Sequence, residues 1–196
     1  MGITNTVLIP IKHRFLFLRY YTYKLTPVVS HLMQLITNTN IRNIQNITIH
    51  NNLILLPHGF DAITFGTKSR KPHISVKKSY FKNNLPKNTQ IYNWLEILSH
   101  EISHIKQIDK YRFLCFGFLP YVSVHLFYYI KSLSHDKSPL EQTPIHNQLL
   151  FKKFYHYSRI VNADMDVINI LQNSEITNEK KISILTDLFN NYVKMA

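Results

Sequence analysis

The residues best suited to chemistry lie in the stretch "SHEISH", where His100 and His104 stand four apart and Glu101 follows the first of them. On a helix, residues four apart share one face, so their two imidazoles can bind a single metal ion. A glutamate beside them can accept a proton from water that the ion activates. The pattern predicts a zinc site with His100 and His104 as ligands and Glu101 as general base. The alternative is a chance pairing of surface histidines around a helical glutamate.

A catalytic zinc ion needs a third protein ligand and leaves its fourth position to water. The position six residues beyond His104 is Lys110 rather than a third histidine, so we expect a carboxylate instead. The candidates are Glu141, in "SPLE", and Asp164, in "NADMD", and we favour Glu141. Residues 138–141 also fit a capping box, with serine as N-cap, proline at N1 and glutamate at N3 of a helix. Both roles of Glu141 stay open at this stage.

The spacing of apolar residues predicts the elements that position these side chains. Over residues 91–108, apolar residues recur at intervals of three and four, which is typical of a helix with one buried stripe. Upstream, residues 27–37 begin with proline and favour a short helix. Residues 46–56 favour a β-hairpin, and residues 60–66 and 73–77 favour strands.

Downstream of the motif, residues 113–130 form the most hydrophobic stretch, which is interrupted by a glycine, a proline and a histidine. These interruptions favour a buried or membrane-surface helix pair over a membrane span. Residues 142–196 favour two or three helices, the last of them capped by Ser174 or Thr177.

The composition limits the classes of protein to consider. The chain has 196 residues, 45% of them hydrophobic, which fits one domain with a substantial core. Its net charge of +12 would suit an anionic partner such as a membrane surface or nucleic acid, but the scattered placement of the lysines favours an ordinary solvated surface. A single cysteine and the lack of a recognisable secretory signal predict a cytoplasmic protein. Association of this protein with a membrane surface stays open. No nucleic-acid-binding module is recognisable, so we expect no specific nucleic-acid partner.

Three segments in order, "DAITFGTK", "LSHEISHIKQ" and "SPLE", resemble small bacterial gluzincin-type zinc metallopeptidase domains. The resemblance covers about residues 45–150. It implies Zn²⁺ as cofactor, His100, His104 and Glu141 as ligands, and Glu101 as general base. Members often carry a further acidic or alanine residue shortly after the last glutamate. This chain has "QTP" there, so we expect the following helix to be short or kinked.

The resemblance also implies a fold. We expect a single zincin-like α+β domain over residues 1–196, with a core at about 45–150 and a helical C-terminal extension at 151–196. Its small antiparallel or mixed sheet would pack on the active-site helix, and a mainly helical C-terminal half would follow. An edge strand of the sheet would lie beside the cleft.

The function predicted from these features is zinc-dependent hydrolysis of peptide bonds in a peptide or protein substrate. The strand residues His73, Ile74, Ser75 and Val76 are the candidate edge on which an extended peptide pairs, with an ordinary sheet strand as the alternative. Two other classes stay open. One is a catalytically inactive zincin-like metal-binding interaction protein, whose cleft is blocked by residues 111–130. The other is a basic peripheral membrane or nucleic-acid-binding protein in which the motif is accidental.

Overall fold

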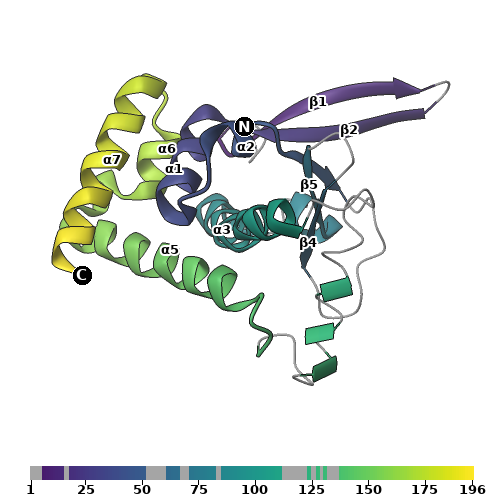
Figure 1. The fold of residues 1–196 in the computed structure, drawn as a ribbon. Helices are drawn as coiled ribbons and strands as arrows, with labels where there is room; N and C mark the ends of the chain where they lie inside the picture. The colour runs from purple at the N-terminus through teal and green to yellow at the C-terminus, as the bar shows by residue number, and fades with distance from the viewer. Residues whose placement is uncertain are drawn as a thin grey trace.

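The computed structural model describes residues 6–15, 18–51, 61–66, 71–82, 85–111, 123–124, 127–128, 130–131 and 137–196. Its elements, in chain order, are β1 (Leu8–Phe15), β2 (Leu18–Leu25), α1 (Pro27–Thr37), α2 (Ile41–Gln45), β3 (Thr48–Asn51), β4 (Ala62–Gly66), β5 (Pro72–Val76), the 3-10 turn η2 (Lys78–Phe81), α3 (Lys87–Tyr111), α5 (Gln142–Val161), the 3-10 turn η3 (Ala163–Met165), α6 (Val167–Gln172) and α7 (Asn178–Met195). Figure 1 shows the sheet on one side of α3 and the other long helices around it.

The described strands form one mixed five-stranded sheet in the order β1-β2-β3-β5-β4. Strands β3 and β5 run parallel, and every other neighbouring pair runs antiparallel. The predicted α+β class, the small mixed sheet and the mainly helical C-terminal half are therefore confirmed. The strands expected at 60–66 and 73–77 correspond to β4 and β5.

Helix α3 packs its apolar stripe against one face of the sheet. Alternate strand residues point to the same face, and on this face Ile49, Ile74 and Val76 are fully buried. From the helix, Trp94 and Leu98 are fully buried as well. Burying a side chain of this size contributes about 1.5–3 kcal/mol, so the contact holds the motif helix firmly on the sheet. The predicted periodic helix is confirmed, with its start at Lys87.

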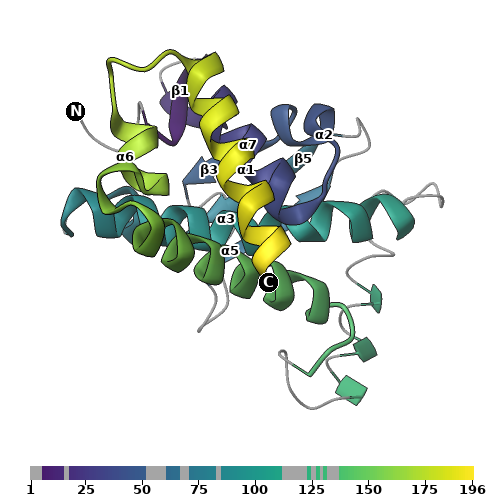
Figure 2. The same ribbon diagram turned by 90° about the vertical axis from the view of Figure 1, so that its left-hand side faces the viewer.

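The remaining helices cover the other sides of α3 (Figures 1 and 2). Helix α1 spans the predicted residues 27–37, with Thr26 as N-cap and Pro27 at the first position. Helix α7 packs on α1, and its predicted cap is Thr177, whose side chain accepts a hydrogen bond from the Lys180 amide. The described C-terminal part contains three α-helices, as predicted.

Helix α5 corrects one expectation. It was expected to be short or kinked because of "QTP" after Glu141, yet it runs for 20 residues, Gln142–Val161. Pro144 stands in its first turn, where backbone N–H groups have no partner within the helix. The proline therefore removes no helical hydrogen bond, and the helix continues past it.

The N-terminal hairpin of β1 and β2 was not predicted. Its sequence mixes basic and aromatic residues on both faces, without the alternation of apolar and polar residues that marks a half-buried strand. The second arm of the hairpin expected at 46–56 and most of residues 113–130 lie outside the described residues. Within the part of the chain that is described, no helix is both long and apolar enough to cross a bilayer.

Candidate metal centre

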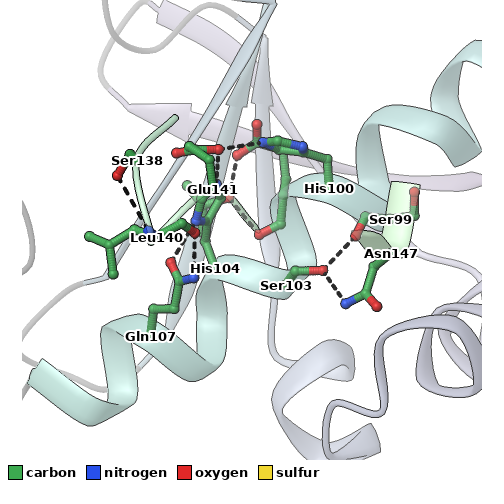
Figure 3. Close-up of polar contacts among 11 residues, drawn as sticks. Ser99, His100, Ser103, His104, Gln107, Ser138, Leu140, Glu141 and Asn147 are labelled. Atoms are coloured by element: carbon green, nitrogen blue, oxygen red, sulfur yellow. Dashed lines mark hydrogen bonds and ion pairs between the residues drawn. The ribbon is translucent and has the colours of Figure 1, made fainter. Parts of the chain in front are cut away.

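Two helices bring the three predicted ligands together (Figure 3). His100 and His104 lie one turn apart on α3, and Glu141 immediately precedes α5. Glu141 Oε2 is 3.2 Å from Nε2 of His100 and 3.6 Å from Nε2 of His104. One ligand atom from each of the three residues lies within 4.8 Å of the others. Among the described residues, these three form the one such group of histidine, cysteine or acidic side chains.

The donor set and its spacing fit a small divalent cation. Two ligands at the usual zinc distances around a tetrahedral ion lie about 3.3 Å from each other, close to the two measured nitrogen–oxygen separations. The side chain of Glu141 is fully buried, whereas that of His100 is 17% exposed. Burying a carboxylate is costly unless a positive charge compensates it. A cation at this position would supply that charge.

The buried carboxylates beside His100 affect the pKa of its imidazole. Burial alone would lower its pKa, but the hydrogen bond that His100 donates to Glu141 and the charges of Glu101 and Glu141 outweigh that effect. The pKa of His100 is therefore raised above its ordinary value. The neighbouring carboxylates thus favour positive charge beside this imidazole, which a metal ion or a proton can provide.

Gln107 orients the second histidine. Its side-chain Nε2 donates to the carbonyl of Leu140, and its Oε1 lies 2.9 Å from Nδ1 of His104. Because a carbonyl can only accept, the amide nitrogen of Gln107 must face Leu140 and its oxygen must face the imidazole. Nδ1 of His104 therefore carries a proton, and Nε2, the nitrogen 3.6 Å from Glu141 Oε2, is the one placed to bind a metal ion.

Glu141 stands at the end of a turn that precedes α5, and the bond from Gln107 to Leu140 ties this turn to α3. The Ser138 hydroxyl accepts from the Leu140 amide at 3.3 Å, and the Glu141 amide donates to the Ser138 carbonyl at 2.9 Å. These bonds close a turn, and α5 begins only at Gln142. The predicted capping box at 138–141 is therefore wrong, since its helix would have started at Pro139. Glu141 directs its carboxylate to the histidines instead.

Further polar contacts hold α5 along α3. Asn147 donates to the Ser103 hydroxyl at 2.8 Å, and that hydroxyl donates to the Ser99 carbonyl at 2.7 Å (Figure 3). One turn further along, Glu96 accepts from Gln148 at 2.7 Å and pairs with Lys152 at 2.9 Å. Together with Gln107, these contacts define what we call the α3–α5 contact. It sets the distance between Glu141 and the two histidines.

Glu101 faces the sheet side of the same region. Its Oε2 accepts a 2.6 Å hydrogen bond from the hydroxyl of Thr64, on β4, and this hydroxyl also lies 3.0 Å from the Glu101 carbonyl. Glu101 is only 6% exposed. Burial raises the pKa of its carboxyl, which nearby His100 and Thr64 partly offset. The carboxylate is thus held in one orientation and is a better proton acceptor than an exposed glutamate.

Asp164, the other candidate ligand, lies elsewhere. It is exposed and belongs to η3, which follows the C-terminal end of α5. The length of α5 separates it from Glu141 by roughly 30 Å. Asp164 therefore cannot share an ion with His100 and His104.

The predicted substrate strand is placed in the interior of the sheet. Residues 73–76 belong to β5, which pairs with β3 on one side and β4 on the other. Both backbone edges are used, so the prediction of an edge strand at His73, Ile74, Ser75 and Val76 is wrong. Among the described strands, the edge next to α3 is β4, the strand that carries Thr64. His73 instead contacts His50, with 2.7 Å between Nδ1 and Nε2.

Comparison of the chain with protein-family models, with curated proteins and with solved structures found no match.

Three residues that build the centre received no role from the sequence. Thr64 stands at an inward position of an alternating strand, where a polar residue among apolar ones is a usable signal. Gln107 lies three residues after His104, within reach on the same helix face. Asn147 carries no local signal, because its partner Ser103 is 44 residues away.

Proposed function

We propose that this protein is a zinc-dependent peptidase with a zincin-like fold. The observation that carries the proposal is the group of His100, His104 and Glu141 beside a buried, oriented Glu101. Two histidines and one carboxylate are a ligand set that catalytic zinc sites use, with one position left for water or substrate. The order of strand, motif helix and third-ligand helix agrees with the resemblance noted in the sequence.

The chain's own residues account for most of what such a site requires. When bound, zinc would polarise a substrate carbonyl and acidify water. Gln107 keeps the proton of His104 on Nδ1, so that Nε2 is a ligand atom. Glu101, whose Oε2 accepts from Thr64, would take up a proton from the attacking water at Oε1 and return it to the leaving amine.

The position of β4 suggests where a peptide binds. As the outermost described strand beside α3, β4 can pair with an extended substrate through backbone hydrogen bonds. Thr64 joins this strand to Glu101. The hydrogen bond between Thr64 and Glu101 would therefore fix the position of the general base relative to the backbone of the bound peptide.

A second candidate is a metal-binding protein without hydrolytic activity. The observation that favours it is burial, because Glu101 and Glu141 are both shielded from solvent among the described residues. In such a protein the ion would stabilise the packing of α5 on α3. Structural zinc sites ordinarily have four protein ligands, and the described residues supply three, which places this candidate second.

Metal analysis combined with hydrolysis of a mixed peptide library tests both candidates. The purified wild type should contain zinc and hydrolyse peptides, and Glu101→Gln should retain zinc while losing about 10²- to 10⁴-fold in rate. Glu175→Gln, an exposed change of the same chemistry, should leave both unchanged. Zinc without hydrolysis in the wild type would favour the second candidate. Absence of zinc would contradict both.

A further inference from the structure

A second glutamine lies next to the centre, at the other end of the motif from Gln107. Gln148 belongs to α5, and its side-chain Nε2 donates to Oε1 of Glu96 at 2.7 Å. Glu96 precedes His100 by four residues on α3, so these two side chains share one face of that helix. The side chain of Gln148 therefore reaches the part of α3 that carries the first histidine.

The bond to Glu96 determines which way the amide of Gln148 is turned. An ionised carboxylate can only accept hydrogen bonds, so Nε2 of Gln148 must face Glu96 and the amide oxygen Oε1 must face away from it. Lys152 pairs with the same oxygen of Glu96 at 2.9 Å, which helps to keep this acceptor in place. The oxygen of Gln148 can then accept a hydrogen bond from a neighbouring donor.

The imidazole of His100 is that donor. Its Nε2 lies 3.2 Å from Oε2 of Glu141 (Figure 3), on the side of the ring where the three candidate ligands meet. A hydrogen bond with Gln148 is one of the contacts that raise the pKa of His100, so the imidazole donates and the glutamine oxygen accepts. Since Nε2 faces Glu141, the ring nitrogen that remains for Gln148 is Nδ1.

A role in helix packing alone explains less of this geometry. A glutamine that only joined α5 to α3 would need its bond to Glu96, and Lys152, one turn further along α5, already makes a bond to the same oxygen. Such a glutamine would have no need to direct its own oxygen at a histidine of the centre.

Gln107 makes the corresponding pair of contacts at the other histidine. Its Nε2 donates to the carbonyl of Leu140, and its Oε1 lies 2.9 Å from Nδ1 of His104. In both places an acceptor outside the centre turns the amide so that its oxygen faces an imidazole. Histidine ligands of metal ions usually donate from their second ring nitrogen to such an acceptor, which fixes the orientation of the ring.

We propose that Gln148 is a positioning residue for the ligand His100, with its Oε1 accepting the Nδ1 proton and its Nε2 anchored on Glu96. The ring is then held with Nε2 towards Glu141, so that His100 releases only its Nε2 proton when a metal ion binds and does not have to turn. The inference rests on the metal centre of the proposed function, but it does not depend on whether that centre hydrolyses peptides.

Competition of the full chain with a zinc chelator dye tests this role. Gln148→Met occupies similar space without polar groups and should lower zinc affinity by about 10- to 100-fold. The matched control is Lys152→Met, which removes the other bond to Glu96 and keeps the amide beside His100. It should bind zinc as the wild type does. Thermal unfolding of the metal-free proteins should show a change in stability too small to account for the loss of affinity in Gln148→Met.

Two changes at the anchor test the orientation of the amide. Glu96→Gln keeps a side-chain oxygen that accepts from Gln148 and should retain most of the zinc affinity. Glu96→Met leaves the amide without its anchor and should lower zinc affinity by about fivefold, as expected for the loss of one hydrogen bond. Equal affinities in these two variants would contradict an anchoring role for Glu96.

Nuclear magnetic resonance of the histidine ring protons gives a readout that helix packing alone would not change. In the zinc-loaded wild type, the Nδ1 proton of His100 should exchange slowly with water and give a resolved signal. Gln148→Met should lose this signal and keep that of His104, and Gln107→Met should do the reverse.

Three results would overturn the proposal: a retained His100 signal in Gln148→Met, wild-type zinc affinity in that variant, or an equal loss of affinity in Lys152→Met. These results are distinct from a failure of the proposed function. Zinc binding without peptide hydrolysis would contradict the peptidase alone, whereas a wild type that binds no zinc would contradict both.

Discussion

The metal centre and the N-terminal hairpin of β1 and β2 are held in place by different kinds of contact. Around the centre, the bonds join residues far apart in the chain: Gln107 and Leu140 are 33 positions apart, and Thr64 and Glu101 are 37 positions apart. In the hairpin, the pairing partners are close in sequence, and even the most distant pair, Leu8 and Leu25, joins two consecutive strands. The centre therefore exists only in the complete fold, whereas the hairpin depends mainly on its own register.

This difference has a consequence for mutations. Residues that share one network couple their effects, while distant residues without common partners act independently. A change at the α3–α5 contact should alter metal affinity and the stability of the zinc-loaded protein together. A change in the N-terminal hairpin should alter neither to a large extent.

The largest expected effect is the loss of a ligand. Glu141→Gln should abolish zinc binding at micromolar metal, because a neutral amide replaces the buried carboxylate between His100 and His104. At a zinc concentration about 100 times the dissociation constant of the wild type, binding adds about 2.7 kcal/mol. The variant should therefore melt about 5–10 °C below the zinc-loaded wild type.

The control for this change is Asp164→Asn, which removes an exposed carboxylate at the other end of α5. It should bind zinc and melt as the wild type does. Zinc retained by Glu141→Gln but lost by Asp164→Asn would reverse the assignment of the third ligand. A chelator should lower the melting temperature of the wild type and the control alike, and should leave Glu141→Gln unchanged.

A smaller effect is expected from the residue that orients a ligand. Gln107→Met should lower zinc affinity by about 10- to 100-fold, since His104 loses its partner at Nδ1 and the turn before Glu141 loses its bond to α3. The matched control, Gln172→Met, removes an amide that bonds Asn88 at an exposed position. Competition with a zinc chelator dye measures both.

Thermal unfolding of the metal-free proteins then separates orientation from packing. If Gln107 acts on the ligand, the loss in zinc affinity should greatly exceed the change in metal-free stability. Wild-type affinity in Gln107→Met would show that the α3 helix alone positions His104.

The same difference in contact explains what the sequence could predict. Helix α3 follows from the local spacing of its apolar residues, which tertiary packing only reinforces. Helices α1 and α7 follow from local caps, Thr26 with Pro27 and Thr177. The two histidines of the centre are likewise a local pattern. Glu141 was selected from the chemistry of the ligand set and from the resemblance, and the structure places it beside them.

Features that depend on the order of distant segments could not be predicted. Strand β5 was expected at an edge, but β4, which precedes it in the chain, pairs outside it. Nothing in the spacing of residues 73–77 indicates that β3 runs parallel to this strand. The capping box at 138–141 was expected from local residue types alone, whereas the Ser138 hydrogen bonds form a turn and α5 begins only at Gln142. The bond from Gln107 to Leu140 ties this turn to α3, and no local pattern indicates it.

The smallest expected effect is on stability in the N-terminal hairpin. Lys12→Thr, an exposed change on β1 opposite Tyr21, should change the free energy of unfolding by no more than about 1 kcal/mol. Urea unfolding measures this, with Lys12→Arg as the control that keeps the charge. Zinc affinity should stay at the wild-type value in both variants. A loss of zinc affinity would mean that the hairpin and the centre share one network, and the division between local and long-range contacts would then not hold.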